Sequence, residues 1–260
     1  MTEYTATELM TVLAARFLTD SDVCFVGAGT PATACDLARL THAPNLTLAD
    51  ESGALGIAGE EGLSEVSASV SVTEMFQYWL QGGRFSVGLL EVTQLDRYAN
   101  INTTVIGDYA APKIRLPGAG SISEVTAHCG RVCITVRHSP KTLVPRVDFL
   151  TALGFGPDGR SRERLGIDTA GPALVITDLC QFKPDPRTHE LTVTSVHRGV
   201  SQQSVRDATG WPVRFADDVT ETISPAADEL RLLRQLEDRL PGTAAPALCG
   251  LGHRSQALRY

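Results

Sequence analysis

Residues 46–56 read Leu-Thr-Leu-Ala-Asp-Glu-Ser-Gly-Ala-Leu-Gly, a short apolar run followed by two acids and a glycine-rich turn. The run predicts a short strand that places Glu51 at its carboxyl end, and open α/β sheets bind their ligands at the carboxyl ends of the strands. The glycines after Glu51 allow another molecule to approach the backbone closely. The alternative is a polar residue that merely leaves a strand before a turn, because loops are generally polar and rich in glycine.

Strand-like and helical runs alternate along the rest of the chain. This alternation predicts the α/β class, with an open, mainly parallel sheet covered by helices. No internal repeat or low-complexity linker interrupts it, so we expect one domain over residues 1–240 and a loose tail over residues 241–260. We expect strands over residues 23–26, 46–48, 85–92, 132–136, 174–176 and 191–195, and helices over residues 7–18, 31–40, 73–81 and 229–240.

The 260 residues are 43% apolar and carry a formal net charge of -7. This acidic balance argues against nucleic acid as a partner, because such binding depends on clustered lysines and arginines that neutralise phosphates. The chain does not begin with a basic start and an apolar segment, and no run approaches the ~18 apolar residues of a membrane-spanning helix. We therefore expect a cytoplasmic protein that binds neither membrane nor nucleic acid.

The six cysteines show no paired Cys-x-x-Cys spacing. Cys129 and Cys133 lie near His128 in the sequence, which could suggest a metal site. A zinc site, however, usually needs four ligands in two close pairs, and a strand over this segment would point the two thiols in directions unsuited to binding one metal ion. We expect no metal and interpret the cysteines as buried thiols in a reducing compartment. His128 and His138, which lie beside strand ends, are interpreted as structural.

The segment Gly27-Ala28-Gly29-Thr30-Pro31-Ala32 satisfies the Gly-x-Gly-x-x-Gly/Ala fingerprint of dinucleotide binding. Asp50 and Glu51 follow about 20 residues later, where a ribose-binding acid lies in such proteins. Two features argue against NAD. The acid is followed by the Ser-Gly-Ala-Leu-Gly turn, and a second glycine loop at residues 118–120 has no role in dinucleotide binding.

The segment Glu51-Ser52-Gly53-Ala54-Leu55-Gly56 resembles the glutamate signature of class I coenzyme A transferases. Their beta subunits have a glutamate, then Asn or Ser, Gly, two apolar residues and Gly or Ala. Four further segments resemble the family and follow in its order. Residues 25–31 resemble its first glycine loop, residues 88–102 resemble the segment before its second glycine loop, and residues 113–121 resemble that second loop. Residues 145–155 resemble the glutaconate-type branch of the family. The chain thus resembles a glutaconate-type beta subunit from about residue 5 to residue 240.

The resemblance implies a fold of the NagB/RpiA/CoA transferase type, with Glu51 as the catalytic nucleophile. The implied route passes from an acyl-glutamyl anhydride to a glutamyl-CoA thioester, and each addition creates an oxyanion that needs fixed donors. Each candidate residue also has a structural alternative: turn geometry for glycines, a solvated charge for lysine, and local backbone hydrogen bonding for asparagine. The candidates are the backbone amides of Gly27, Ala28 and Gly118 for the oxyanions, and Asn100, Asn102, Gly120 and Lys113 for coenzyme A.

A glutamate suits this exchange for a reason independent of the family. Its carboxylate is already ionised at neutral pH, needs no histidine base, and resembles the acid being exchanged, so the exchange is nearly thermoneutral. The resemblance implies an acyl-CoA and a carboxylic acid as substrates, with coenzyme A as substrate and no further cofactor. It also implies a separate alpha subunit of similar fold, in a heterodimer or a larger assembly such as a heterotetramer.

Other activities occur on the scaffold that this chain resembles. They include acyl-CoA hydrolases of steroid ring-cleavage products and decarboxylases, and in both the glutamate position is changed. Glu51 therefore favours transfer over hydrolysis or decarboxylation. A noncatalytic subunit has no reason to keep the glutamate and both glycine loops, so we rank that alternative last.

Overall fold

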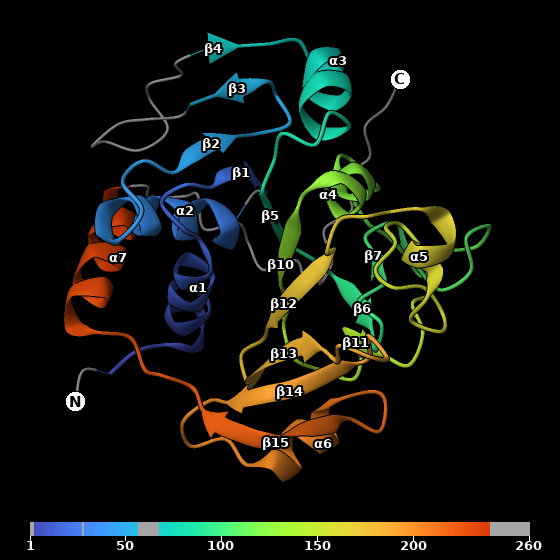
Figure 1. Ribbon diagram of the computed structural model, residues 1–260. Helices are drawn as coiled ribbons and strands as arrows, with labels where there is room; N and C mark the ends of the chain where they lie inside the picture. The colour runs from blue at the N-terminus through green and yellow to red at the C-terminus, as the bar shows by residue number, and fades with distance from the viewer. Residues whose placement is uncertain (1–2, 28, 57–67, 240–260) are drawn as a thin grey trace, which may run out of the picture.

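The computed structural model describes residues 3–27, 29–56 and 68–239 of the chain (Figure 1). The expected tail over residues 241–260 lies outside the described residues, so the division into a domain and a tail stays a prediction. None of the helices in the described ranges combines the length and the apolar character that crossing a bilayer requires.

A large mixed sheet runs through the described part of the chain. Its five central strands are parallel, and antiparallel pairs extend it on both sides. This arrangement confirms the predicted open, mainly parallel α/β sheet. In spatial order, the strands are β15 (Arg214–Glu221), β14 (Leu191–Val196), β13 (Cys180–Pro184), β12 (Pro172–Ile176), β10 (Arg131–Thr135), β5 (Val87–Glu91), β1 (Val23–Val26), β2 (Thr47–Ala49), β3 (Ala54–Leu55) and β4 (Ala68–Ser69).

Both faces of the central strands are buried, because neighbouring side chains point into two different apolar clusters. Cys24 joins the cluster that contains α1, α2 and α7, whereas the next residue, Phe25, joins the cluster that contains η1 and α4. Figure 1 shows α1, α2 and α7 together on one side of the sheet and α4 on the other. The helices are α1 (Ala6–Phe17), α2 (Thr30–Thr41), α3 (Val72–Glu74), the π-helix η1 (Met75–Leu80), α4 (Ile122–His128), α5 (Ser161–Leu165), α6 (Gln202–Ala208) and α7 (Ala227–Arg239).

Two ion pairs join the last described helix, α7, to the first, α1. Arg16 on α1 contacts Glu229 on α7 at 2.6 Å, and Arg234 on α7 contacts Glu8 on α1 at 2.6 Å. Glu8 also closes a capping box with Thr5 at the start of α1. The chain ends of the described fold are therefore held against the same face of the sheet.

The segment between β5 and α4 forms structure that the sequence analysis did not predict. It contains strands of only two or three residues that build two small sheets beside the main one. The segment connects the carboxyl end of β5 to the second glycine loop, which lies just before α4. The segment contributes β6 (Gln94–Asp96) and β7 (Ile101–Asn102) to one sheet, whose third strand, β11 (Leu143–Val144), follows β10 in the chain. It contributes both strands of the other sheet, β8 (Val105–Ile106) and β9 (Ile114–Arg115).

The five cysteines in the described ranges are all buried and free. Burial raises the pKa of Cys129 to about 12, which keeps this thiol protonated and unreactive at neutral pH. Burial likewise lowers the pKa of His138 to about 4, and its ring nitrogens pair with the hydroxyls of Thr177 and Thr209. These contacts agree with a structural role for His138.

Candidate active site

Glu51 lies in a tight turn between β2 and β3 at the carboxyl edge of the sheet. The neighbouring Asp50 organises this turn: its Oδ1 accepts hydrogen bonds from the Ser52 amide at 2.9 Å and the Ser52 hydroxyl at 2.6 Å. The antiparallel pairing of Ala49 with Leu55 closes the hairpin. Because Asp50 accepts the hydrogen bonds that hold the turn, the turn does not need the Glu51 side chain. This side chain is exposed and can contact a substrate.

The fold brings the second glycine loop to Glu51. The Ser121 hydroxyl donates a hydrogen bond to Glu51 Oε2 at 2.9 Å, although the two residues are 70 positions apart in sequence. A Cβ atom at Gly120 would lie 3.6 Å from the same carboxylate oxygen. The predicted nucleophile therefore lies against the loop that the sequence analysis associated with it.

The first glycine loop connects β1 to α2 and lies beside a second carboxylate. Glu91, the last residue of β5, accepts a hydrogen bond from the Thr30 amide at 3.2 Å through its Oε2. This oxygen would be 2.9 Å from a Cβ atom at Gly29. Because β2 and β5 pair with opposite edges of β1, Glu51 and Glu91 both belong to the carboxyl edge of the sheet. No pattern in the sequence indicated a role for Glu91.

The predicted oxyanion donors differ in availability. The Gly27 amide donates to the Leu89 carbonyl at 3.0 Å, and the Gly118 amide donates to the Thr103 carbonyl at 2.8 Å. Neither amide is therefore free in this conformation, and their oxyanion role stays a prediction. Ala28, the third predicted donor, lies outside the described residues.

Asn100 and Asn102, which the sequence analysis assigned to coenzyme A, are buried and bonded within the protein. The Asn100 side chain bonds to Asp96 and to the backbone of Gly154 and Gly156. The Asn102 side chain donates to Gln94 Oε1 at 2.8 Å, among other contacts. Direct contact of these asparagines with coenzyme A stays a prediction, whereas the observed hydrogen bonds hold the strands before the second glycine loop.

Lys113, the remaining predicted ligand of coenzyme A, is exposed and lies immediately before β9. Its amide closes the β8–β9 hairpin by donating to the Ile106 carbonyl at 2.9 Å. Its ammonium group forms no ion pair within the part of the chain that the structure describes. The charge is thus available to a ligand, and its role stays a prediction.

The metal-site alternative at Cys129 and Cys133 gains no support from the geometry. His128 contacts Glu124 one helical turn away, at 3.3 Å. Within residues 3–27, 29–56 and 68–239, no group of three or more histidine, cysteine, aspartate or glutamate side chains is arranged to hold a metal ion.

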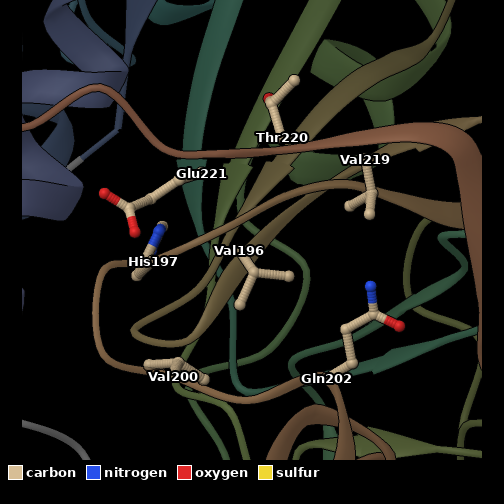
Figure 2. Close-up of a pocket in the computed structure, with 7 residues that line it drawn as sticks. All are labelled: Val196, His197, Val200, Gln202, Val219, Thr220 and Glu221. Carbon is tan, nitrogen blue, oxygen red and sulfur yellow. The ribbon is translucent and has the colours of Figure 1, made fainter.

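A cavity of about 200 Å³ lies between β14 and β15 (Figure 2). These strands form the opposite end of the sheet from β2 and β3, which flank Glu51. We therefore assign the cavity no part in the chemistry of Glu51. Its lining residues are Val196, His197, Val200, Gln202, Val219, Thr220 and Glu221.

Comparison with known proteins identifies the family. The sequence model of the family described as Coenzyme A transferase matches residues 7–208. The B subunit of the 3-oxoadipate CoA-transferase from Pseudomonas knackmussii is 46% identical over 248 residues, which are 92% of this chain and 95% of that relative. The chain therefore belongs to the coenzyme A transferase family, and the predicted class, the beta subunit of a CoA transferase, is confirmed.

Two further comparisons agree with this assignment. The B subunit of the glutaconate CoA-transferase from Acidaminococcus fermentans is 28% identical over 260 residues, 94% of this chain and 95% of that relative. The crystal structure of that enzyme matches with a TM-score of 0.81 at 25% identity, covering 90% of this chain and 95% of that one. The cholesterol ring-cleaving hydrolase IpdB subunit of Mycobacterium tuberculosis is 28% identical over 217 residues, 78% of this chain and 81% of that relative.

Proposed function

We propose that this chain is the beta subunit of a heteromeric CoA transferase in which Glu51 carries coenzyme A between two carboxylic acids. The observation that supports it most is the position of the Glu51 carboxylate, which is exposed at the carboxyl edge of the sheet and bordered by Gly120 and Ser121. The Asp50 carboxylate, by contrast, accepts a hydrogen bond from the Ser52 amide within the turn. Glu51 is thus the carboxylate of this turn that remains available to a substrate.

The reaction proceeds by two kinds of acyl transfer. Glu51 attacks the thioester carbonyl of the acyl-CoA, the carbon–sulfur bond breaks, and an acyl-glutamyl anhydride and CoA thiolate result. The thiolate then attacks the glutamyl carbonyl, forming the glutamyl-CoA thioester and releasing the first acid. An acceptor acid attacks this thioester, and the steps run in reverse to form the new acyl-CoA.

The oxyanions need fixed hydrogen-bond donors, each worth about 3 kcal/mol where such donors have been removed. The amides of Ala119 and Gly120 donate no hydrogen bond within the described residues, unlike those of Gly27 and Gly118. They lie in the loop that contacts Glu51. We therefore add these two amides to the predicted set as donors toward the substrate carbonyl.

For the substrate, we propose the CoA ester of a dicarboxylic acid. The relatives named for 3-oxoadipate and glutaconate both act on such acids, and the 3-oxoadipate enzyme is the more similar in sequence. A 3-oxo dicarboxylic acid is therefore the first compound to test as acceptor, and its CoA ester the first to test as donor.

The proposed partner is an alpha subunit that covers Glu51. These relatives are named as one of two kinds of subunit, and Glu51 is exposed in this chain alone. An uncovered anhydride would react with water, and donors in a high dielectric would stabilise oxyanions less. We therefore expect a heterodimer or a larger heteromer to be the active form, in the cytoplasm.

The test is an exchange assay on the chain purified with its alpha subunit. 3-Oxoadipyl-CoA, glutaryl-CoA, succinyl-CoA and acetyl-CoA serve as donors, and 3-oxoadipate and glutaconate serve as acceptors. We expect acid-dependent formation of a new acyl-CoA by the pair and negligible activity of the chain alone. CoA release that does not depend on an acceptor acid would favour the hydrolase alternative instead, and full transfer by the lone chain would contradict the two-subunit account.

A further inference from the structure

We propose that Ser121 is a second catalytic residue, which stabilises the oxyanion that forms on the carbonyl of Glu51 itself. This inference rests on the proposed function, because it assigns Ser121 a part in the glutamyl acyl transfers. The starting observation is the 2.9 Å hydrogen bond from the Ser121 hydroxyl to Glu51 Oε2. Ser121 is buried, whereas the carboxylate that it contacts is exposed.

The usual structural use of a serine in this position is absent. Ser121 precedes α4 as its N-cap, and an N-cap serine ordinarily accepts a hydrogen bond from an amide in the first turn. The Ser121 side chain makes no such bond, and its backbone has φ -88° and ψ -5° rather than the extended conformation typical of a cap. The hydroxyl is therefore directed to Glu51 instead of to its own helix.

The hydrogen bond makes the two carboxylate oxygens of Glu51 different. A hydroxyl has one hydrogen to donate, and Ser121 gives it to Oε2. Oε1 accepts no hydrogen bond within the described residues. Oε1 is thus the oxygen that attacks the substrate, while Oε2 stays at Ser121.

The chemistry then places the same hydroxyl at the reacting atom of the next step. When Oε1 attacks the thioester, it becomes the bridging oxygen of the anhydride, and Oε2 remains the carbonyl oxygen of Glu51. Attack of the CoA thiolate on Cδ forms a carbon–sulfur bond and moves the carbonyl electron pair onto Oε2. Collapse breaks the bond from Cδ to Oε1, which leaves with the released acid as its carboxylate.

Ser121 therefore faces each tetrahedral intermediate centred on Glu51 Cδ, including the one formed when the acceptor acid attacks. A hydrogen bond to an oxygen strengthens as that oxygen becomes negative, so the donor favours the transition state over the ground state. The adjacent Gly120 has no side chain beside Oε2, which leaves the thiolate room to approach.

The experiment compares four variants in the assembled enzyme: Ser121→Ala, Ser121→Cys, Ser121→Thr and, as a matched control on the same helix, Ser123→Ala. Rapid-quench mass spectrometry measures how fast the glutamyl-CoA thioester forms from acyl-CoA and how fast an acceptor acid discharges it. We expect Ser121→Ala and Ser121→Cys to slow both steps about 100-fold, the cost typical of one lost oxyanion donor. The KM for acyl-CoA should change less than about 3-fold, because the bond strengthens chiefly in the transition state.

The remaining outcomes decide the inference. Ser121→Thr, which keeps the hydroxyl, should restore most of the rate, and Ser123→Ala should match the wild type. Unchanged thioester kinetics in Ser121→Ala, a loss confined to KM, or a folded Ser121→Thr as slow as Ser121→Ala would each overturn the role of Ser121. If wild-type enzyme forms no thioester on Glu51, the proposed function fails instead, so the two failures are distinguishable.

Discussion

Thr103 and Gly118 are joined by two reciprocal hydrogen bonds. The Gly118 amide donates to the Thr103 carbonyl at 2.8 Å, and the Thr103 hydroxyl donates to the Gly118 carbonyl at 2.7 Å. This pair fixes the start of the second glycine loop next to the end of β7, only three residues before Ser121. The loop that meets Glu51 is thus held by the small sheets inserted after β5.

Thr103→Val should loosen this attachment while keeping the shape of the side chain. We expect kcat to fall about 10-fold through displacement of the loop. Loss of one hydrogen bond should lower the free energy of unfolding by about 1 kcal/mol. Steady-state kinetics and urea denaturation measure the two effects. Thr194→Val on β14 is the control, because the hydroxyl of Thr194 makes a long, 3.5 Å contact with the Gln181 carbonyl. An equal loss of activity in the control would show that Thr103 has no special link to the site.

Alanine at Gly118 and at Gly120 should affect different properties. Gly118 has a φ of +102°, which side chains rarely adopt, although no atom of the described residues lies within 4 Å of its Cβ position. Gly118→Ala should therefore cost about 1 to 3 kcal/mol of stability. Gly120 has a φ of +48°, and its Cβ would lie beside Glu51 Oε2, so Gly120→Ala should chiefly lower kcat. Thermal unfolding and exchange kinetics on both variants check this. A loss of kcat without a loss of stability in Gly118→Ala, together with a loss of stability without a loss of kcat in Gly120→Ala, would contradict these roles of the two glycines.

Lys113→Ala tests the predicted contact with the phosphates of coenzyme A. If the Lys113 ammonium pairs with a phosphate, its removal should raise the KM for acyl-CoA about 3- to 10-fold and leave kcat nearly unchanged. The effect should shrink as salt is added, because an exposed charge pair is screened. Lys183→Ala, at an exposed lysine on β13, is the control. A KM unchanged in Lys113→Ala would remove this residue from the coenzyme A site.

The ion pair between Asp22 and Arg131 should make stability depend on acidic pH. Burial disfavours the charged carboxylate, but hydrogen bonds from Arg131 and Ser86 outweigh it and lower the pKa of Asp22 from 3.8 to about 2. A lowered folded-state pKa contributes stability above pH 3.8 that is lost as the pH falls toward 2, about 2 kcal/mol in all. Urea titrations of wild type and Asp22→Asn should show a difference that is constant near neutrality and narrows between pH 4 and pH 2. A difference independent of pH would contradict the ion-pair account.

The main sheet could be predicted from the sequence because its central strands are buried on both faces. Such strands appear as short aliphatic runs, and β1 was predicted to the residue. The strands β6 to β9 were missed since they are only two or three residues long and include polar side chains such as Asn102. Their stability comes from contacts with distant segments, which leave no local periodicity.

The candidate site could be predicted in part for a similar reason. Glu51 stands within a recognisable local segment, so one stretch of sequence was enough to select it. Ser121 became a candidate only through a contact across 70 positions, and Glu91 was found beside the first glycine loop only through a contact across 61 positions. Asn100 and Asn102 were assigned to coenzyme A by resemblance, which stays a prediction. The hydrogen bonds that their buried side chains make to Asp96 and Gln94 became visible only in the structure. Contacts between residues as far apart in the sequence as Glu51 and Ser121 leave no local pattern, so they can be identified only from the structure.

The most direct test of the account is the site of covalent attachment of coenzyme A. The assembled enzyme is incubated with acyl-CoA and then treated with borohydride, which reduces a glutamyl thioester to an alcohol, and its peptides are examined by mass spectrometry. Glu51→Ala and Glu163→Ala, at an exposed glutamate on α5, are the negative and matched controls. We predict that Glu51 alone is reduced, that the label is absent in Glu51→Ala, and that Glu163→Ala behaves as wild type. Reduction at Glu91 or any other acid, or full transfer activity in Glu51→Ala, would contradict the account.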